Sequence, residues 1–445
     1  MTAEACVMNK LAVALAADSA VTVASSPGPK IFQSADKLFQ LSEADPVAAM
    51  VYGSASFLGV PWETIIKRYR SLQGGHSYAT VEDHGKAFLR FLETDRTLFP
   101  ESRQQRSFAD DLRSLFRDLL DKIREHLKTA FGDGQERSAN DVKRLVDGAI
   151  SNYAKQLSKS PLVAKLPRTF PGTVRRKYAS TITVAIKEVF ERLPLTESAR
   201  RNLRKIAGDI SIRGQWEDTT GLVIAGFGRQ QVFPSFFHTN VERLLANRLR
   251  HREADVQSIS DKKMSIVKPF AQSEMVHTYM EGIEPGVLQF FLTALRDVFS
   301  GLPEAVASSA PGMSDTDRTV WRGELQSLLQ EQFGRLDTSW GAYRNQHHVQ
   351  PITSTVAMLP KDELASMAES LVNLTVLRRR TSTEAETVGG PIDVAVITKG
   401  DGFVWIKRKH YFSSELNPRY MARLTERKKE WQASGTPASG RRKKS

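Results

Sequence analysis

The sequence predicts an α+β protein with a layered core and a large helical insertion. Stretches of strand character occur at the start, near residue 220 and near residue 395, and two groups of helix-like segments separate them. Strand groups that alternate with helix groups in this way are typical of α+β architectures. At 445 residues the chain also exceeds one simple core, so we expect two domains or one domain with insertions.

Residues 1–60 favour two β-hairpins. The stretch ACVMNKLAVALAAD suggests a turn at Asn9-Lys10, and KLFQLSEADPVAAMVYG suggests a second turn at Ala44-Asp45-Pro46. Pro61 then opens PWETIIKRYRSLQG, where proline in the first turn and glycine just past the end indicate a helix. We take residues 1–78 as the first part of the core.

Residues 79–217 change to helical periodicity. In SFADDLRSLFRDLLDKIREHLKTAFG the apolar residues recur at helical spacing, and Ser107 is the expected N-cap. Two further stretches, SANDVKRLVDGAISNYAKQL and TITVAIKEVFERL, show the same pattern. We predict that this segment is a helical insertion whose charged residues lie on the exposed helix faces.

Residues 218–412 are predicted to complete the core. Strands are expected in TGLVIAGFGRQQVFPSF and KKMSIVKPFAQ, and a final hairpin around Lys399-Gly-Asp-Gly402. The helices expected between them are SEMVHTYMEGI, PGVLQFFLTALRDVF, RGELQSLLQEQF and KDELASMAESLVNLTVLRRR.

The net charge of +13 is concentrated at the C-terminal end. From Arg419 to Ser445 there are nine Lys/Arg and two Glu, which gives 9 − 2 = +7. We expect residues 413–445 to form a disordered, solvated basic tail, because the composition is rich in Ser, Gly and Pro. Binding of nucleic acid through this tail is the less favoured alternative, and an acidic protein is another candidate partner.

Several common sites are absent from the sequence. Cys6 is the single cysteine, which excludes an internal disulfide and a cysteine-based zinc site, and we expect it to pack as a small apolar residue. There is no P-loop, H-E-x-x-H or G-x-S-x-G motif, and His347-His348 lies in a polar stretch that we interpret as a loop. We therefore expect no cofactor and no metal.

The apolar runs indicate neither a membrane span nor an export signal. They are strand-length, and no basic segment precedes the first of them. The sequence therefore favours a cytoplasmic protein without a membrane partner.

The N-terminus offers a different chemistry. Removal of Met1 would expose Thr2, which carries a hydroxyl nucleophile next to an α-amine whose ordinary pKa is about 7.7–8.0, so that the amine can act as a base. A neighbouring lysine would lower the pKa of the hydroxyl and of the amine, and a buried carboxylate would hold that lysine charged and in place.

The stretch LAVALAADSAVTV resembles the signature of proteasome β-type subunits and their bacterial relatives. In that family the catalytic Asp follows the N-terminal Thr by sixteen residues, which is also the separation of Thr2 and Asp18. The family's catalytic Lys matches Lys37 in ADKLFQL, and its oxyanion-hole glycine matches Gly53 in AAMVYGSAS. The GGPID stretch beginning at Gly389 is similar to the bacterial Anbu branch.

The resemblance covers residues 2–73, 218–235 and 364–412 and has several departures. The family's second residue, Thr or Ser, is Ala3 here, and its Ser before Gly-Gly is Val388. The supporting acid would fall at Ala385, between Glu384 and Glu386, and a further family Ser matches Ser273 only loosely, where an N-cap is the simpler interpretation. We therefore treat Ser273, Glu384 and Glu386 as supporting candidates only.

The resemblance implies a four-layer αββα sandwich of the N-terminal nucleophile hydrolase superfamily and a threonine-type peptidase activity. Thr2 would be the nucleophile, Lys37 would stabilise its alkoxide, Asp18 would hold Lys37, and the N–H of Gly53 would donate to the oxyanion. It also implies a polypeptide substrate, a homo-oligomer with a ring as one form, and an ATP-dependent unfoldase partner. A catalytically silent assembly protein is the alternative.

Overall fold

The computed structural model describes most of the chain in two compact units. Unit 1 comprises Met1–Leu38, Val232–Pro234 and Ser258–Ser445, and unit 2 comprises Phe39–Gln231 and Ser235–Gln257. The described residues are 2–23, 30–131, 138–163, 166–214, 216, 218–309, 312, 314–382, 388–413, 415–419, 422 and 426. Most of residues 413–445, the tail expected to be disordered, lies outside the described residues.

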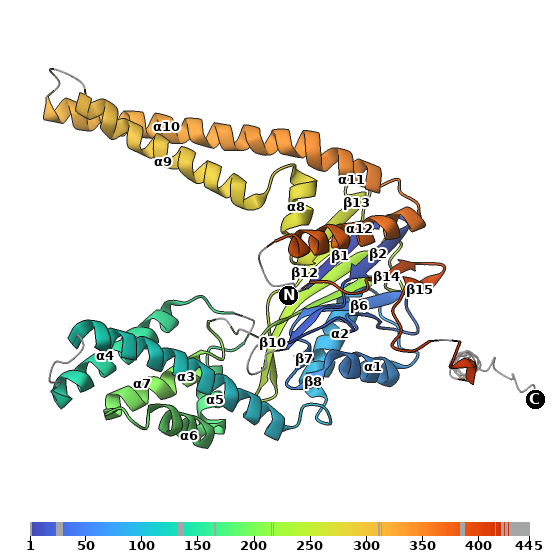
Figure 1. Ribbon diagram of the computed structural model, residues 1–445, viewed down its shortest axis with the longest axis horizontal. Coiled ribbons are helices and arrows are strands. Elements are labelled where there is room, and N and C mark those ends of the chain that lie inside the picture. Colours follow the sequence, from blue (N-terminus) through green and yellow to red (C-terminus); the bar gives the residue numbers. More distant parts are fainter. Residues whose placement is uncertain are drawn as a thin grey trace, which may run out of the picture. The chain divides into compact units, whose positions relative to one another are not determined.

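Unit 1 is built on a five-stranded antiparallel sheet with the order β13-β1-β2-β14-β15 (Figure 1). Its strands are β1 (Ala3–Asn9), β2 (Ala12–Ala17), β13 (Ser265–Ala271), β14 (Asp393–Thr398) and β15 (Gly402–Lys407). A separate two-stranded pair joins β3 (Val21–Val23) to β4 (Lys30–Phe32). The two predicted hairpins that fall in this unit are confirmed as β1–β2 and β14–β15.

The first turn lies one residue later than predicted. Asn9 is the last residue of β1, and its side-chain oxygen accepts the backbone N–H groups of Leu11 at 2.9 Å and Ala12 at 3.3 Å. The asparagine closes the turn with its side chain, so the reversal is at Lys10-Leu11.

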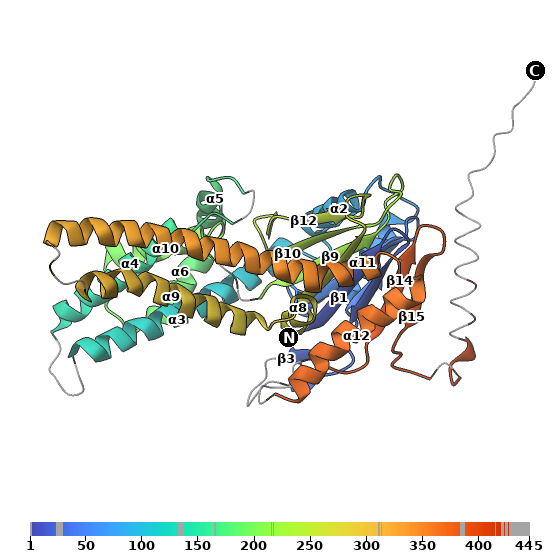
Figure 2. The ribbon, with the colours of Figure 1, turned by 90° about the horizontal axis from the view of Figure 1, so that it is seen from above.

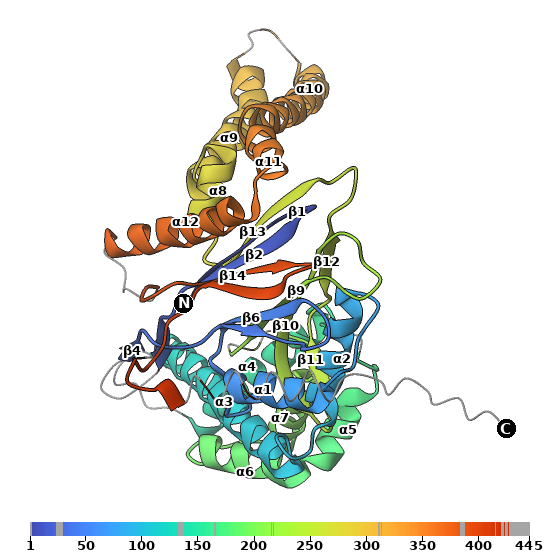
Figure 3. The ribbon, with the colours of Figure 1, turned by 90° about the vertical axis from the view of Figure 1, so that its right-hand side faces the viewer.

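Helices cover one face of the unit 1 sheet (Figure 3). These are α8 (Glu274–Glu281), α11 (Gln350–Val356) and α12 (Lys361–Arg380). Ala3, Ala5 and Val7 of β1 belong to the apolar cluster beneath them. Because side chains alternate along a strand, Thr2, Glu4 and Cys6 point to the opposite face. Cys6 is fully buried there, as predicted.

Two long helices form a hairpin in unit 1. These are α9 (Pro285–Ser309) and α10 (Asp315–Arg344), which lie side by side in Figures 1 and 2. The prediction of a loop at His347-His348 is wrong, because both residues lie in the π-helical turn η1 (Asn345–Val349) between α10 and α11. The ring of His347 packs 4.4 Å from that of Tyr343, a helical contact that polarity alone does not reveal.

Unit 2 contains a second antiparallel sheet with the order β11-β10-β9-β6-β5, and β12 pairs with β10. The strands are β5 (Leu38–Gln40), β6 (Val47–Gly53), β9 (Thr220–Gly226), β10 (Ser235–Leu245), β11 (Arg248–His251) and β12 (Asp255–Ser258). A short pair joins β7 (Ser56–Phe57) and β8 (Val60–Pro61). The second predicted hairpin is confirmed as β5 and β6. The strands β11 and β12 were not predicted, because their polar sequences lack a clear period.

The helices α1 (Trp62–Gln73) and α2 (Val81–Thr94) share one apolar cluster with β6, β9 and β10. The helix predicted after Pro61 is therefore confirmed as α1. The sequence pattern alone did not resolve α2, whose start is fixed by a capping box between Thr80 and Asp83.

Beyond α2, which packs on the sheet, the predicted helical segment has an apolar core of its own, which Leu245 of β10 also joins. The helices of this core are α3 (Glu101–Phe131), α4 (Ala139–Lys159), α5 (Phe170–Lys177), α6 (Ala179–Phe190) and α7 (Glu197–Asp209). The expectation that Ser107 caps α3 is wrong, because α3 begins at Glu101, six residues earlier. Its first turns are polar, and buried Gln104 there bonds to Phe99 O and Asn247 rather than packing apolar surface. An apolar stripe that starts at Phe108 could not indicate this start.

Helices and antiparallel sheets together agree with the predicted α+β class. The four-layer sandwich and the boundaries at residues 78, 217 and 412 stay predictions. In the part of the chain that the structure describes, no helix has both the length and the apolar character needed to cross a bilayer.

Candidate active site

Thr2, Lys37 and Asp18 form a hydrogen-bonded chain in unit 1. The Nζ of Lys37 donates to Thr2 Oγ1 at 3.0 Å and to Asp18 Oδ1 at 2.6 Å. All three residues are buried, with relative exposures of 4% for Thr2, 5% for Lys37 and 1% for Asp18. The ammonium therefore sits between a hydroxyl and a carboxylate, shielded from water.

Backbone groups hold the Asp18 carboxylate in place. Its Oδ1 also accepts the N–H of Ala3 at 3.1 Å, while Oδ2 accepts the N–H groups of Ala20 at 3.2 Å and Gly389 at 3.0 Å. Three backbone donors and Lys37 thus fix both oxygens. These contacts fix the position of the carboxylate and orient Oδ1 toward Lys37.

The sheet fixes the start of the chain. The carbonyl oxygen of Thr2 accepts the N–H of Gln272, and the N–H of Asp18 donates to Ala3 O, both at 3.1 Å. Thr2 is thus held against β13 and Ala3 against the end of β2. The sixteen-residue spacing follows from the hairpin itself, whose register pairs Glu4 with Ala17.

The Gly389-Gly390 pair supplies a close backbone approach. Gly390 has φ +77°, and a Cβ there would lie 2.9 Å from Cβ of Gln33. A side chain at this position would push the loop away from its neighbours. That displacement would also move the adjacent Gly389 N–H, which donates a hydrogen bond to Asp18. The preceding Val388 is buried in the apolar cluster beneath α12, so the residue that departs from the family's Ser packs as a hydrophobic side chain.

Gly53 and Ser273 are the other predicted site residues that the structure describes, and Ser273 directly follows Gln272, whose N–H donates to Thr2 O. Gly53 ends β6 in unit 2, where φ is +87° and a Cβ would meet Thr219 O at 2.3 Å, so glycine is required there on steric grounds. Its role as an oxyanion donor stays a prediction. Ser273 occupies the N-cap position of α8, although its side chain makes no capping hydrogen bond. Glu384 and Glu386 lie outside the described residues.

Glu4 is a buried acid that the sequence analysis missed. It lies on β1 two residues after Thr2, is 2% exposed, and its two carboxyl oxygens have no hydrogen-bond partner among the described residues. Burial raises the pKa of Glu4 well above its usual range, the charge of Lys37 partly offsets this, and Asp18 adds to it. The period-two pattern, which places Glu4 on the face of Thr2, was the signal that could have identified it.

We expect Glu4→Gln to change how stability depends on pH. A carboxyl whose folded pKa is raised binds more protons in the folded state, so its contribution to stability is complete below the unfolded value of about 4.3 and is lost as pH rises through the folded pKa. Melting temperatures measured from pH 4 upward should therefore diverge, with the variant gaining on the parent. Glu324→Gln, at an exposed position of α10, is the control and should show no such divergence. Parallel curves for Glu4→Gln and parent would contradict the burial of this acid.

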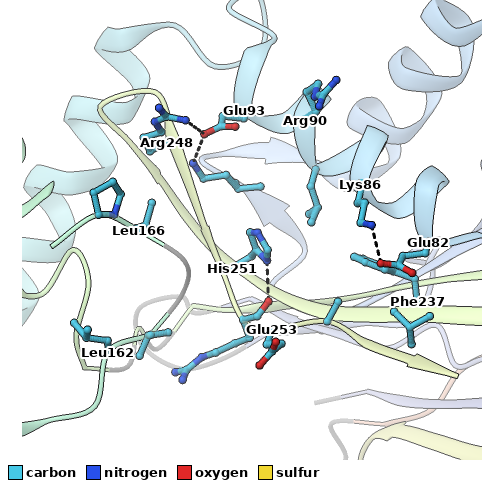
Figure 4. Close-up of a pocket in the computed structure, with 17 residues that line it drawn as sticks. Glu82, Lys86, Arg90, Glu93, Leu162, Leu166, Phe237, Arg248, His251 and Glu253 are labelled. Carbon is cyan, nitrogen blue, oxygen red and sulfur yellow. Dashed lines mark hydrogen bonds and ion pairs between the residues drawn. The ribbon is translucent and has the colours of Figure 1, made fainter. Parts of the chain in front are cut away.

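A hollow of ≈ 950 Å³ in unit 2 has a different character (Figure 4). Four of its charged side chains form two ion pairs: Lys86 lies 2.7 Å from Glu82, and Arg248 lies 3.7 Å from Glu93. None of the predicted site residues lines it. We therefore assign the candidate chemistry to the Thr2 group and not to this hollow.

No protein-family model and no curated protein matches this chain. Solved structures that are similar to it include two Anbu proteins. The helical assembly of the Anbu complex from Pseudomonas aeruginosa is 9% identical with a TM-score of 0.26, over 98% of each chain. An Anbu Gly-1 mutant from Hyphomicrobium sp. strain MC1 is 10% identical with a TM-score of 0.26, over 99% of this chain and 100% of that chain. The resemblance to Anbu thus finds counterparts among solved structures. The backbones superpose only in part at this score, so we base the proposal below on this chain's own residues.

Proposed function

We propose that the protein is a threonine-type peptidase whose nucleophile is Thr2, exposed by removal of Met1. The observation that carries the proposal is the buried chain from Thr2 Oγ1 through Lys37 Nζ to Asp18 Oδ1. Three residue types suited to nucleophilic catalysis meet there from separate parts of the sequence. The proposal includes the four-layer αββα core, a cytoplasmic location, a homo-oligomer and an unfoldase that delivers polypeptide substrates.

The reaction would begin with attack of Thr2 Oγ1 on a peptide carbonyl. Because Lys37 donates to this oxygen, the hydroxyl proton is free to pass to the α-amine, directly or through a water. The Lys37 ammonium stabilises the negative charge that develops on the oxygen, and Gly53 N–H is the proposed donor to the carbonyl oxyanion. The proton then passes to the leaving amine as the C–N bond breaks, and water hydrolyses the resulting ester to regenerate Thr2.

The test is the intact mass of the full chain before and after treatment with a peptide β-lactone. We expect the untreated mass to lack Met1, and the treated protein to gain one acyl group that peptide mapping places on Thr2. Thr2→Ser should still be acylated, since it keeps a hydroxyl, whereas Thr2→Ala should not.

Retention of Met1 on all molecules would contradict the proposal, as would equal acylation of Thr2→Ala. The first result would favour the alternative function, a catalytically silent assembly protein. The replacement of the family's Ser by buried Val388 is the observation that keeps this alternative in view.

A further inference from the structure

Helix α9 uses one apolar stripe to pack against α10. The less exposed residues recur every three or four positions, and they are Leu288, Leu292, Leu295, Phe299, Pro303 and Ala307. The ring of Phe299 lies 6.0 Å from that of Phe333 in α10. Two charged residues of α9 also contact α10: Arg296 lies over the Phe333 ring, and Glu304 pairs with Arg322 at 2.8 Å. The ring of Phe291, at the edge of this contact, lies 6.0 Å from that of Trp340 in α10, and much of α9's other apolar surface stays exposed.

A second apolar stripe on α9 is exposed. It consists of Val287, Phe291, Ala294, Val298, Gly301 and Ala305, which follow one another at intervals of 4, 3, 4, 3 and 4 residues. Val287 and Val298 are each 57% exposed and Phe291 is 44% exposed, while Phe290 and Leu302 flank the stripe at 76% and 39%. This spacing is the heptad pattern of a coiled-coil seam, and a helix that is apolar on both sides needs a second partner. We call these six residues the α9 seam.

The α9 seam is complementary to itself when the direction of one copy is reversed. Antiparallel pairing that places Ala294 opposite Val298 of the other copy also places Val287 opposite Ala305 and Phe291 opposite Gly301. Every layer then joins a larger to a smaller side chain, as close packing requires. Parallel pairing would instead set Phe291 against Phe291 and Gly301 against Gly301, which gives overfilled and empty layers.

We infer that two copies of this chain dimerise through an antiparallel coiled coil of their α9 seams. The seam runs about 27 Å along the helix, from the rise of 1.5 Å per residue. A Cβ on Gly301 would meet nothing within 4 Å, which leaves room for the other copy's phenylalanine. The seam contains no charged residue, so the contact buries no unpaired charge. This inference does not depend on the proposed peptidase activity.

Cysteine cross-linking tests the pairing direction in the full chain. Ala294→Cys and Val298→Cys are made in separately tagged proteins, mixed and oxidised mildly. The antiparallel seam predicts a disulfide between the two different variants and little within either alone, whereas a parallel seam predicts the reverse and would overturn the inference. The parent is the control, because its single thiol, Cys6, is buried and burial raises its pKa to about 12.

Sedimentation equilibrium supplies an independent test that needs no cysteine. The parent should be a dimer at micromolar concentration, and Val298→Glu should raise its dissociation constant at least about 30-fold, as for a central interface residue. Ser300→Glu adds the same charge at an exposed position outside the seam and should leave the dimer intact. A monomeric parent at about 50 μM, or an unchanged dimer in Val298→Glu, would refute the α9 contact. So would a monomeric parent that binds lipid vesicles through α9.

Discussion

Lys37→Met should slow acylation of Thr2 by about 10²–10³-fold, the cost typical of removing one donor that stabilises developing charge. The methionine keeps most of the stem volume of a residue that is 5% exposed, so the change removes chiefly the ammonium. Acylation rates with the peptide β-lactone, followed by intact mass, measure the effect. Labelling at the parental rate would show that Lys37 does not activate Thr2.

The same variant also has a cost in stability. Removal of one partner of a fully buried ion pair typically costs about 3–5 kcal/mol. We expect the lower part of that range here, because three backbone N–H groups still satisfy the Asp18 carboxylate. Adding Asp18→Asn would not restore stability, since the asparagine amide would face at least one of these N–H donors.

Lys409→Met provides the matched control. Lys409 is a half-buried lysine of unit 1 whose side chain is 10% exposed, and it pairs with Asp393 and lies 3.1 Å from Asp36. Its loss should lower the melting temperature to a similar degree, yet acylation of Thr2 should continue near the parental rate. The comparison separates a chemical role of Lys37 from a general effect of losing a buried charge.

Glu242→Ala should destabilise unit 2 by about 3–5 kcal/mol, seen as a melting temperature lower by about 6–20 °C. Glu242 on β10 is fully buried and pairs with Arg250, whose side chain is also inaccessible, and with Arg252 at 2.7 Å. Burial lowers the pKa of Arg250 to about 10 and Glu242 opposes this, so the loss of Glu242 strands a buried guanidinium.

The Glu242–Arg250 pair connects separate parts of unit 2, which is why we expect a large loss of stability in Glu242→Ala. Arg250 also donates to the backbone carbonyl of Arg213 at 3.1 Å and to that of Gly214 at 2.6 Å, and so ties the end of the helical segment to β11. The double variant Glu242→Ala/Arg250→Met removes both charges and should recover part of the lost stability. A single variant that melts within about 2 °C of the parent would contradict the buried pairing.

The sequence by itself was sufficient for features that depend on near neighbours. The helix of Trp62–Gln73, the helix of Lys361–Arg380 and the hairpin around Lys399–Gly402 follow from periodicity, proline and glycine. The approach of Asp18 to the start of the chain is of the same kind, because a hairpin's register brings Asp18 opposite Ala3. Such features are encoded within about twenty residues, where backbone geometry leaves few alternatives.

Only the tertiary structure decided which groups share a buried site and which faces remain uncovered. Gly389 donates to a carboxylate 371 residues away, Glu4 becomes a buried acid that has no hydrogen bond within the described part of the chain, and the seam on α9 is left exposed beside α10. Local spacing places Glu4 and the seam on a face, but burial or exposure of that face depends on which distant segments pack together. The strand that carries Thr2 also carries Glu4 on the same face, but only the packing of the whole sheet withdraws both from water.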